Sequence, residues 1–137
     1  MREIKFKGWC EKDSEWRHGF YITNGNIHEI NTMLKNGEFY ASQVDADSVG
    51  QYTGIKDKNG AEIYEGDLIA VRHKKGKYLI KEKPTEIYFS DGAFQFELLS
   101  ESREMFLFEV CSSNESIAIS HTCEVVGNIY ENPELLS

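Results

Sequence analysis

Apolar and polar residues alternate along most of this chain, and the alternation predicts β-strands. In residues 3–9, Ile4 and Phe6 fall on one face and three charged residues fall on the other, as in a half-buried strand. Other segments with strand-like patterning, bounded by polar or glycine-containing turns, are residues 16–23, 38–44, 49–55, 68–73, 78–81 and 123–130. The pattern therefore predicts a chain built mainly from short strands.

The clearest local element is a hairpin within residues 85–99. If Asp91-Gly92 is its two-residue loop, Phe89 faces Phe94 across the strand pair. Because paired residues share a face of the sheet, one face is expected to be apolar and buried: Ile87, Phe89, Phe94, Phe96 and Leu98. The opposite face is expected to be wet: Glu86, Tyr88, Gln95 and Glu97.

The central segment QYTGIKDKNGAEIYEGDLI, residues 51–69, contains two turn signals. Asn59-Gly60 fits either a type I turn followed by a left-handed glycine or a two-residue type I′ turn. In the second turn, Gly66 is expected to have a positive φ and Asp67 to accept backbone N–H groups. The residues expected in the core are Ile55, Ile63, Leu68 and Ile69.

Three elements are less determined by the pattern. Residues 27–34 fit a helical stripe, but the segment is short and a strand remains open. Residues 105–110, MFLFEV, fit a buried strand or part of a short helix. At the end of the chain, Asn132 before Pro133 predicts the start of a one-turn helix whose two leucines pack on the core.

These elements together predict a mainly β protein with few short helices. The short strands and tight turns of residues 49–137 are typical of a small SH3-like barrel. Residues 1–48 are expected to form a β-rich extension that packs on the barrel, so that the chain is one compact unit. The sequence contains no internal repeat or flexible linker.

Composition places the chain among soluble proteins. Its 137 residues include 15 basic and 23 acidic residues, for a net charge of −8, which argues against general nucleic-acid binding. The odd number of cysteines without C-x-x-C spacing (Cys10, Cys111 and Cys123) indicates reduced thiols. No apolar run reaches the roughly 20 residues of a membrane helix, and we expect a cytoplasmic protein without a membrane partner.

Three blocks of sequence resemble the YopX family of phage and prophage proteins. They are MREIKFKGW at the start, QYTGIKDKNGAEIYEGDLI in the middle and EVVGNIYENPELL at the end, in the order and spacing of that family. The resemblance implies a phage or prophage origin, a bacterial host cell and a β-rich fold with an SH3-like barrel. It implies no activity, catalytic residue or cofactor.

Carboxylates are dense in the central segment, where Asp57, Glu62, Glu65 and Asp67 lie near Asn59. Oxygen ligands of this kind suit Ca²⁺ or Mg²⁺, but the spacing does not match an EF-hand loop. The alternative is that Asp57 and Asn59 hold a turn through local backbone hydrogen bonds. We favour the turn, and expect no metal, cofactor or catalytic residue.

His121 and Cys123 are two residues apart, so they share a face of a strand. Such a pair could be two zinc ligands or a nucleophile with its base, but no second ligand pair has metal-site spacing. The favoured interpretation is a small buried thiol beside an imidazole.

The segment RHKKGKYLIKEK is the one strongly basic stretch of this acidic chain. A basic hairpin tip with an aromatic residue could follow a nucleic-acid backbone and stack a base. The alternative is a solvated hairpin whose lysines discourage pairing between strand edges. The candidate nucleic-acid contacts are Arg72, Lys74, Lys75, Lys77 and Tyr78.

Six aromatic residues could line a recognition surface or belong to the core: Trp9, Trp16, Tyr21, Tyr52, Tyr64 and Tyr130. The standard catalytic and nucleotide-binding motifs are absent from the sequence. Our leading hypothesis is a non-enzymatic phage or prophage accessory protein that binds a host or phage protein. The alternatives are nucleic-acid binding through residues 72–83 and a metal-dependent enzyme. The sequence leaves open whether the chain forms a homo-oligomer.

Overall fold

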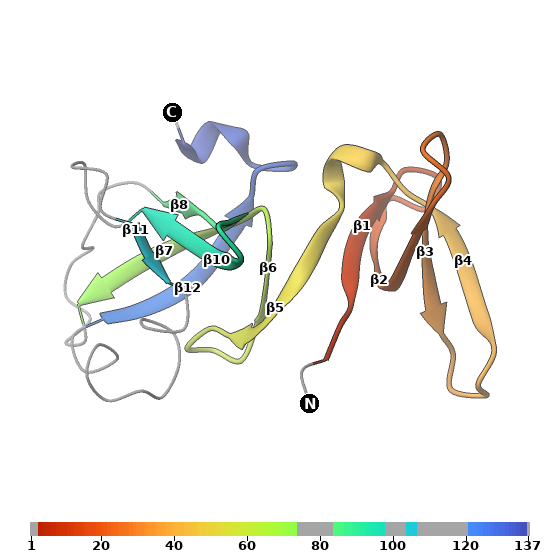
Figure 1. Ribbon diagram of the computed structural model, residues 1–137, viewed down its shortest axis with the longest axis horizontal. Helices are drawn as coiled ribbons and strands as arrows, with labels where there is room; N and C mark the ends of the chain where they lie inside the picture. The colour runs from red at the N-terminus through yellow and green to blue at the C-terminus, as the bar shows by residue number, and fades with distance from the viewer. Residues whose placement is uncertain (1–2, 74–83, 98–103, 107–120, 137) are drawn as a thin grey trace. The chain divides into compact units, whose positions relative to one another are not determined.

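The computed structural model describes residues 3–73, 84–97, 104–106 and 121–136 (Figure 1). The chain divides into two compact units, Met1–Tyr52 and Thr53–Ser137. The division falls inside a strand, whereas the sequence predicted a boundary between residues 48 and 49. The packing of one part on the other stays a prediction.

The N-terminal unit is an antiparallel sheet with the strand order β4-β3-β2-β1-β5. Its elements are β1 (Phe6–Cys10), β2 (Glu15–Thr23), β3 (His28–Met33), β4 (Phe39–Gln43), the short 3₁₀ helix η1 (Ala46–Ser48) and the first half of β5 (Gly50–Lys56). Residues 27–34, which the pattern left open between helix and strand, thus form a strand.

The C-terminal unit begins within β5, which lies next to β6. A second sheet has the order β12-β7-β8, and a third has the order β11-β10-β9. The elements are β6 (Glu62–Tyr64), β7 (Asp67–His73), β8 (Thr85–Glu86), β9 (Tyr88–Ser90), β10 (Ala93–Glu97), β11 (Glu104–Phe106), β12 (His121–Asn128) and the 3₁₀ helix η2 (Pro133–Leu136).

The mainly β prediction is confirmed. Over the described ranges the sheets are open and antiparallel, and no closed barrel forms among them. The SH3-like character of residues 49–137 is therefore not established. Of the predicted strands, residues 78–81 lie outside the described residues, as does most of the MFLFEV segment, whose Glu104–Phe106 neighbourhood forms β11.

The predicted hairpin at Asp91-Gly92 is confirmed. Ala93 pairs with Ser90 and Phe94 with Phe89. Asp91 and Gly92 have φ values of 52° and 79°, as a type I′ turn requires at both central positions. The two-residue loop therefore sets the register of β9 and β10.

The predicted faces of this hairpin are only partly correct. Ile87 and Phe96 are fully buried as expected, but Phe89 is 53% exposed and lies edge-on to the ring of Phe94. Gln95, expected on the wet face, is 3% exposed. Its Nε2 donates a hydrogen bond to the backbone oxygen of Ser90 at 2.6 Å, which satisfies the buried amide.

Each unit has its own core. In the N-terminal unit, Cys10, Ile30 and Val44 are buried together. The core of the C-terminal unit contains Ile63, Ile69, Val71, Ile87, Phe96 and Cys123, with Ile55 packed against it. Leu68 is also fully buried, so the core residues expected from the central segment are confirmed.

The chain end differs from the prediction. A single 3₁₀ turn does start at Pro133, but the side chain of Asn132 accepts a hydrogen bond from the Asn128 N–H at 3.2 Å. It therefore closes the turn after β12. Leu135 is half-buried and Leu136 is 42% exposed, so the expected packing of both leucines on the core is wrong for Leu136.

Candidate functional site

The Asp57 carboxylate is a structural connector. Its Oδ1 accepts the backbone N–H groups of Asn59 at 2.8 Å and Ala61 at 2.9 Å. Its Oδ2 accepts the N–H of Val125 in β12 at 2.9 Å. The first two bonds hold the type I turn whose left-handed residue is Gly60, with a φ of 84°. The third bond ties this turn to the distant strand β12.

Asp67 performs a similar task in the second turn. Its buried Oδ2 accepts the Tyr64 N–H at 2.8 Å. Gly66, with a φ of 90°, donates to the Ile87 oxygen and accepts from the Ile129 N–H. The prediction that these residues hold the frame of the strands is therefore confirmed for both turns.

The other carboxylates of the central segment, and Glu86 near them, do not form a common site. Glu62 accepts a hydrogen bond from the Tyr64 hydroxyl at 3.1 Å. Burial, together with the charge of Glu65, raises the pKa of Glu86 above its ordinary value. Across the part of the chain that the structure describes, no group of three or more His, Cys, Asp or Glu side chains is arranged to hold a metal ion.

The other sequence-predicted candidates are not brought into a site. Cys123 is buried and disulfide-bonded, so it is neither a nucleophile nor a metal ligand, and the expectation of reduced thiols is wrong for this residue. Cys10 is a free, buried thiol. Arg72 lies on β7 opposite Thr122, while Lys74, Lys75, Lys77 and Tyr78 lie outside the described residues. The nucleic-acid contact stays a prediction.

Strand register in the N-terminal sheet places apolar side chains on one common face. Phe20 pairs with Asn31, and Asn31 pairs with Ala41. Met33 pairs with Phe39. Since side chains alternate along each strand and paired residues share a face, all of these side chains lie on the same side of the sheet. We call this side the outer face.

The outer face carries four large apolar side chains that are exposed to solvent, beside polar residues such as Asn31 and Glu29. Phe20 is 51% exposed, Ile22 52%, Met33 62% and Phe39 56%. The rings of Phe20 and Phe39 contact each other, with centroids 6.1 Å apart. Large apolar side chains gathered on one exposed face mark interaction surfaces more often than singly scattered ones do.

Farther along the same face, aromatic and basic side chains pair. The rings of Trp9 and Trp16 meet edge to face at a centroid distance of 5.6 Å. The Lys7 Nζ lies 4.6 Å from the centroid of Trp16, within the range of a cation–π interaction. The indole N–H of Trp9 donates to Glu11 at 3.0 Å. These contacts order the aromatic side chains without burying them fully.

The opposite side of the sheet is the inner face, which contains the core residue Ile30. Opposite Ile30 on β2 is Tyr21, whose hydroxyl lies 2.6 Å from Nδ1 of His28. The Tyr21 ring also packs against Phe6. The two sides of this sheet thus differ, since one is closed by packing and the other remains open.

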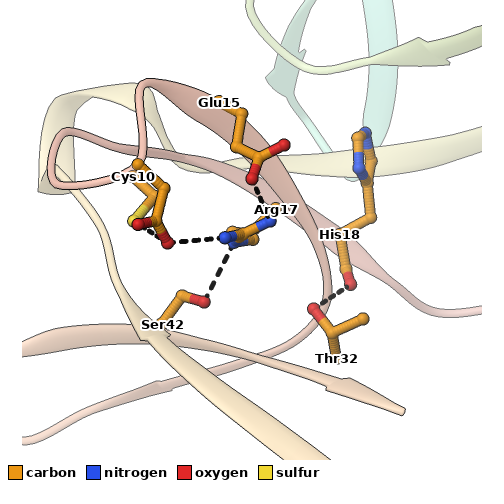
Figure 2. Close-up of polar contacts among 7 residues, drawn as sticks. Cys10, Glu15, Arg17, His18, Thr32 and Ser42 are labelled. Atoms are coloured by element: carbon orange, nitrogen blue, oxygen red, sulfur yellow. Dashed lines mark hydrogen bonds and ion pairs between the residues drawn. The ribbon is translucent and has the colours of Figure 1, made fainter. Parts of the chain in front are cut away.

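A polar cluster around Arg17 on β2 lies on the inner face and joins β2 to β4 (Figure 2). The guanidinium donates to Ser42 Oγ at 3.1 Å and forms ion pairs with Asp13 at 2.6 Å and Glu15 at 2.8 Å. It also lies over the ring of Tyr40. Burial disfavours the charge, but the two carboxylates outweigh it and raise the pKa of Arg17 above its ordinary value.

The Arg17 cluster therefore braces strands and offers no open anion site, because the guanidinium is engaged by two carboxylates and a hydroxyl. The Cys10 thiol completes the cluster by contacting Asp13 at 3.7 Å. Figure 2 also shows the Thr32 hydroxyl donating to the His18 backbone oxygen, at 2.9 Å, which ties β3 to β2.

Comparison with known proteins places the fold. The model of the YopX protein family matches residues 5–137. The chain belongs to the YopX family. Among solved structures, protein EF1440 from Enterococcus faecalis is 26% identical with a TM-score of 0.57, and yopX from Bacillus subtilis is 18% identical with a TM-score of 0.59. Both comparisons cover 100% of each chain.

Membership of the YopX family confirms the resemblance seen in the sequence. No curated protein matches the chain, and neither of the two structural relatives has a name that states an activity. Within the described ranges, no helix of this YopX-family chain has the length and apolarity needed to cross a membrane.

Sequence reasoning found some aromatic residues of the outer face and missed others. Trp9, Trp16, Tyr21 and Tyr130 are half-buried, whereas Tyr52 and Tyr64 are buried. The exposed Phe20 and Phe39 were not singled out. The available signal was in residues 16–23, where Phe20 and Ile22 alternate with Tyr21. A half-buried strand needs packing on one face only. A strand with apolar residues on both faces needs packing on both, and without it one apolar face is exposed to solvent.

Proposed function

We propose that this YopX-family chain is a non-enzymatic accessory protein of a phage or prophage, and that it binds a partner protein through the outer face. The observation that supports this most directly is the exposure of four large apolar side chains on one ordered sheet face: Phe20, Ile22, Met33 and Phe39. Protein partners cover such faces because burying apolar surface is favourable.

The magnitude is adequate for a specific contact. Fully burying a large apolar side chain contributes about 1.5–3 kcal/mol, and each of these four is about half exposed. Phe20 and Phe39 also contact each other, so little side-chain freedom is lost on binding. A cluster of preordered aromatic and aliphatic side chains is typical of the centre of an interface.

The polar groups also favour a binding role over catalysis. Asp57 and Asp67 are occupied by backbone N–H groups, and Arg17 by carboxylates. A catalytic acid, base or nucleophile needs access to a substrate. Cys10 is buried in the core of the N-terminal unit, out of reach of a substrate.

The test is affinity capture from the native bacterial host with the wild-type chain and the double variant Phe20→Ser, Phe39→Ser. A matched control is Phe89→Ser with Leu136→Ser, which removes two side chains of similar exposure, 53% and 42%, that belong to the C-terminal unit. The proposal predicts one saturable partner retained by wild type and control and lost by the outer-face variant. Equal retention by both variants would refute it.

Nucleic-acid binding by Arg72, Lys74, Lys75, Lys77 and Tyr78 is the second candidate. It predicts affinity for single-stranded DNA or RNA that decreases as salt increases, since phosphate contacts release counterions. It also predicts that changing the three lysines to Glu abolishes binding while the Phe20→Ser, Phe39→Ser variant retains it. Salt-independent or undetectable binding would exclude this candidate.

A further inference from the structure

Among the strands that the structure describes, β4 is the last of the N-terminal sheet and forms its edge. Among the described strands it pairs only with β3. The register is regular, from Met33 opposite Phe39 to Glu29 opposite Gln43, without a bulge. An edge strand exposes backbone donors and acceptors that another strand can pair with.

The hydrogen-bond pattern identifies which backbone groups face outward. The Val44 N–H donates to the His28 oxygen at 2.8 Å, and the Leu34 N–H donates to the Glu38 oxygen at 2.7 Å. In an antiparallel pair, hydrogen-bonded and non-hydrogen-bonded positions alternate. Continuing the alternation along β4 leaves the N–H and C=O groups of Phe39, Ala41 and Gln43 directed away from β3.

The edge lacks the features that discourage pairing. Residues 39–43 read FYASQ and contain no charge and no proline, and the strand has no bulge. Proteins commonly protect an edge with lysine, proline or a bulge, because an unprotected edge invites another strand. The outward backbone groups belong to the residues whose side chains lie on the outer face, so an added strand would continue this face.

The charge near the β4 edge favours a basic strand there over a second copy of this acidic chain. The segment from Lys35 to Asp47 contains one lysine and three carboxylates (Glu38, Asp45 and Asp47), and the whole chain has a net charge of −8. If two copies paired antiparallel with Ala41 on the symmetry axis, Glu38 would lie opposite Val44 of the second copy, beside its Asp45. Like charges in such positions are unfavourable.

We propose that β4 accepts an extended, basic segment of the partner protein as an additional strand, with apolar side chains at alternate positions next to Phe39 and Ala41. This inference rests on the proposed function and specifies the partner's binding element. Backbone hydrogen bonds to the three outward residues fix the segment in place, and the alternating side chains provide selectivity.

The first experiment is amide hydrogen exchange of the wild-type chain with a short synthetic peptide in which Lys and Val alternate. Protection of the Phe39, Ala41 and Gln43 amides is expected at saturating peptide. A peptide in which Glu replaces Lys should bind at least several-fold more weakly. Absence of protection at millimolar peptide, or equal binding of the two peptides, overturns the inference.

The second experiment compares Ala41→Pro with Ala41→Val. Proline removes the outward N–H, which β3 does not use, and proline is tolerated on edge strands where the N–H faces solvent. Valine keeps the N–H and the strand preference. Affinity for the Lys/Val peptide should fall roughly tenfold in the proline variant, as for one lost hydrogen bond, and stay within twofold or so in the valine variant.

The same variants separate this inference from the proposed function. If the double variant Phe20→Ser, Phe39→Ser abolishes capture of the partner and Ala41→Pro does not, the outer face binds the partner but strand addition to β4 is refuted. If neither variant affects capture, the proposed function fails as well. Concentration-dependent dimers that Ala41→Pro removes would instead identify a second copy as the occupant.

Discussion

At the scale of single residues, the buried carboxylates of the central segment act on the backbone. Asp57 lies between three N–H groups that belong to a turn and to a strand more than 60 residues away. The sequence predicted the local bonds to the turn. It could not predict the bond to Val125, because a contact over that separation depends on how the chain closes and not on neighbouring residue types.

Replacing Asp57 with Asn should lower the free energy of unfolding by about 2 kcal/mol, since the neutral amide has one acceptor oxygen and its NH₂ group would meet a backbone donor. Urea unfolding monitored by far-ultraviolet circular dichroism, which reports the strands of both units, would measure this. Asp47→Asn, at an exposed position of η1, is the matched control. Equal unfolding midpoints for the two variants would contradict the structural role.

Glu86 gives a pH dependence with a defined sign. Burial and the charge of Glu65 raise its pKa in the folded protein, so between its ordinary pKa of 4.5 and the raised value the folded state binds more protons than the unfolded state. The contribution of Glu86 to stability is therefore lost as the pH increases through that window.

The variant Glu86→Gln should accordingly be more stable than wild type at neutral pH, and the difference should shrink as the pH decreases below the window. Thermal unfolding across this pH series measures it, with the exposed Glu134→Gln as the control. A variant that is less stable than wild type at neutral pH would show that the Glu86 charge stabilises the fold instead.

At the scale of elements, turn chemistry was the most predictable feature. Asp91-Gly92 and the Asn59-Gly60 region specify their turns locally, so the register of β9 with β10 follows from the order of residues alone. Burial was less predictable. Alternation indicates which side chains share a face, but Phe89 and Gln95 show that coverage of that face depends on strands that are distant in sequence.

Gly19 is required for the close approach of β2 to β3 in the sheet that supports the outer face. A Cβ at this position would lie 2.1 Å from the backbone oxygen of Asn31, and a backbone atom cannot rotate away. We expect Gly19→Ala to separate β2 from β3 and to destabilise the fold by roughly 3 kcal/mol.

A suitable comparison is Gly25→Ala, because Gly25 has a φ of 95° but nothing within 4 Å of an added Cβ. That substitution should cost about 1 kcal/mol from backbone strain alone. Chemical denaturation of the two variants would measure the difference. If Gly19→Ala were as mild as Gly25→Ala, the close approach of β2 to β3 would not be required.

At the scale of the whole molecule, the sequence predicted the class of fold and the family but not the surface that we assign to function. The chemistry of carboxylates and basic residues is visible in a sequence, so candidate sites built from them can be named from the sequence alone. Exposed apolar residues such as Phe20 and Phe39 look like core residues in a sequence, and only the register and packing of the sheet show that they remain uncovered.

The central claim is that the outer face contacts a partner protein. Incorporating a photo-crosslinking amino acid at Phe39, and separately at Leu136 as the control, and irradiating in the native bacterial host tests it directly. If the outer face binds the partner, one discrete protein adduct forms from position 39 and is absent from position 136. No adduct at position 39, or the same adducts from both positions, would contradict it.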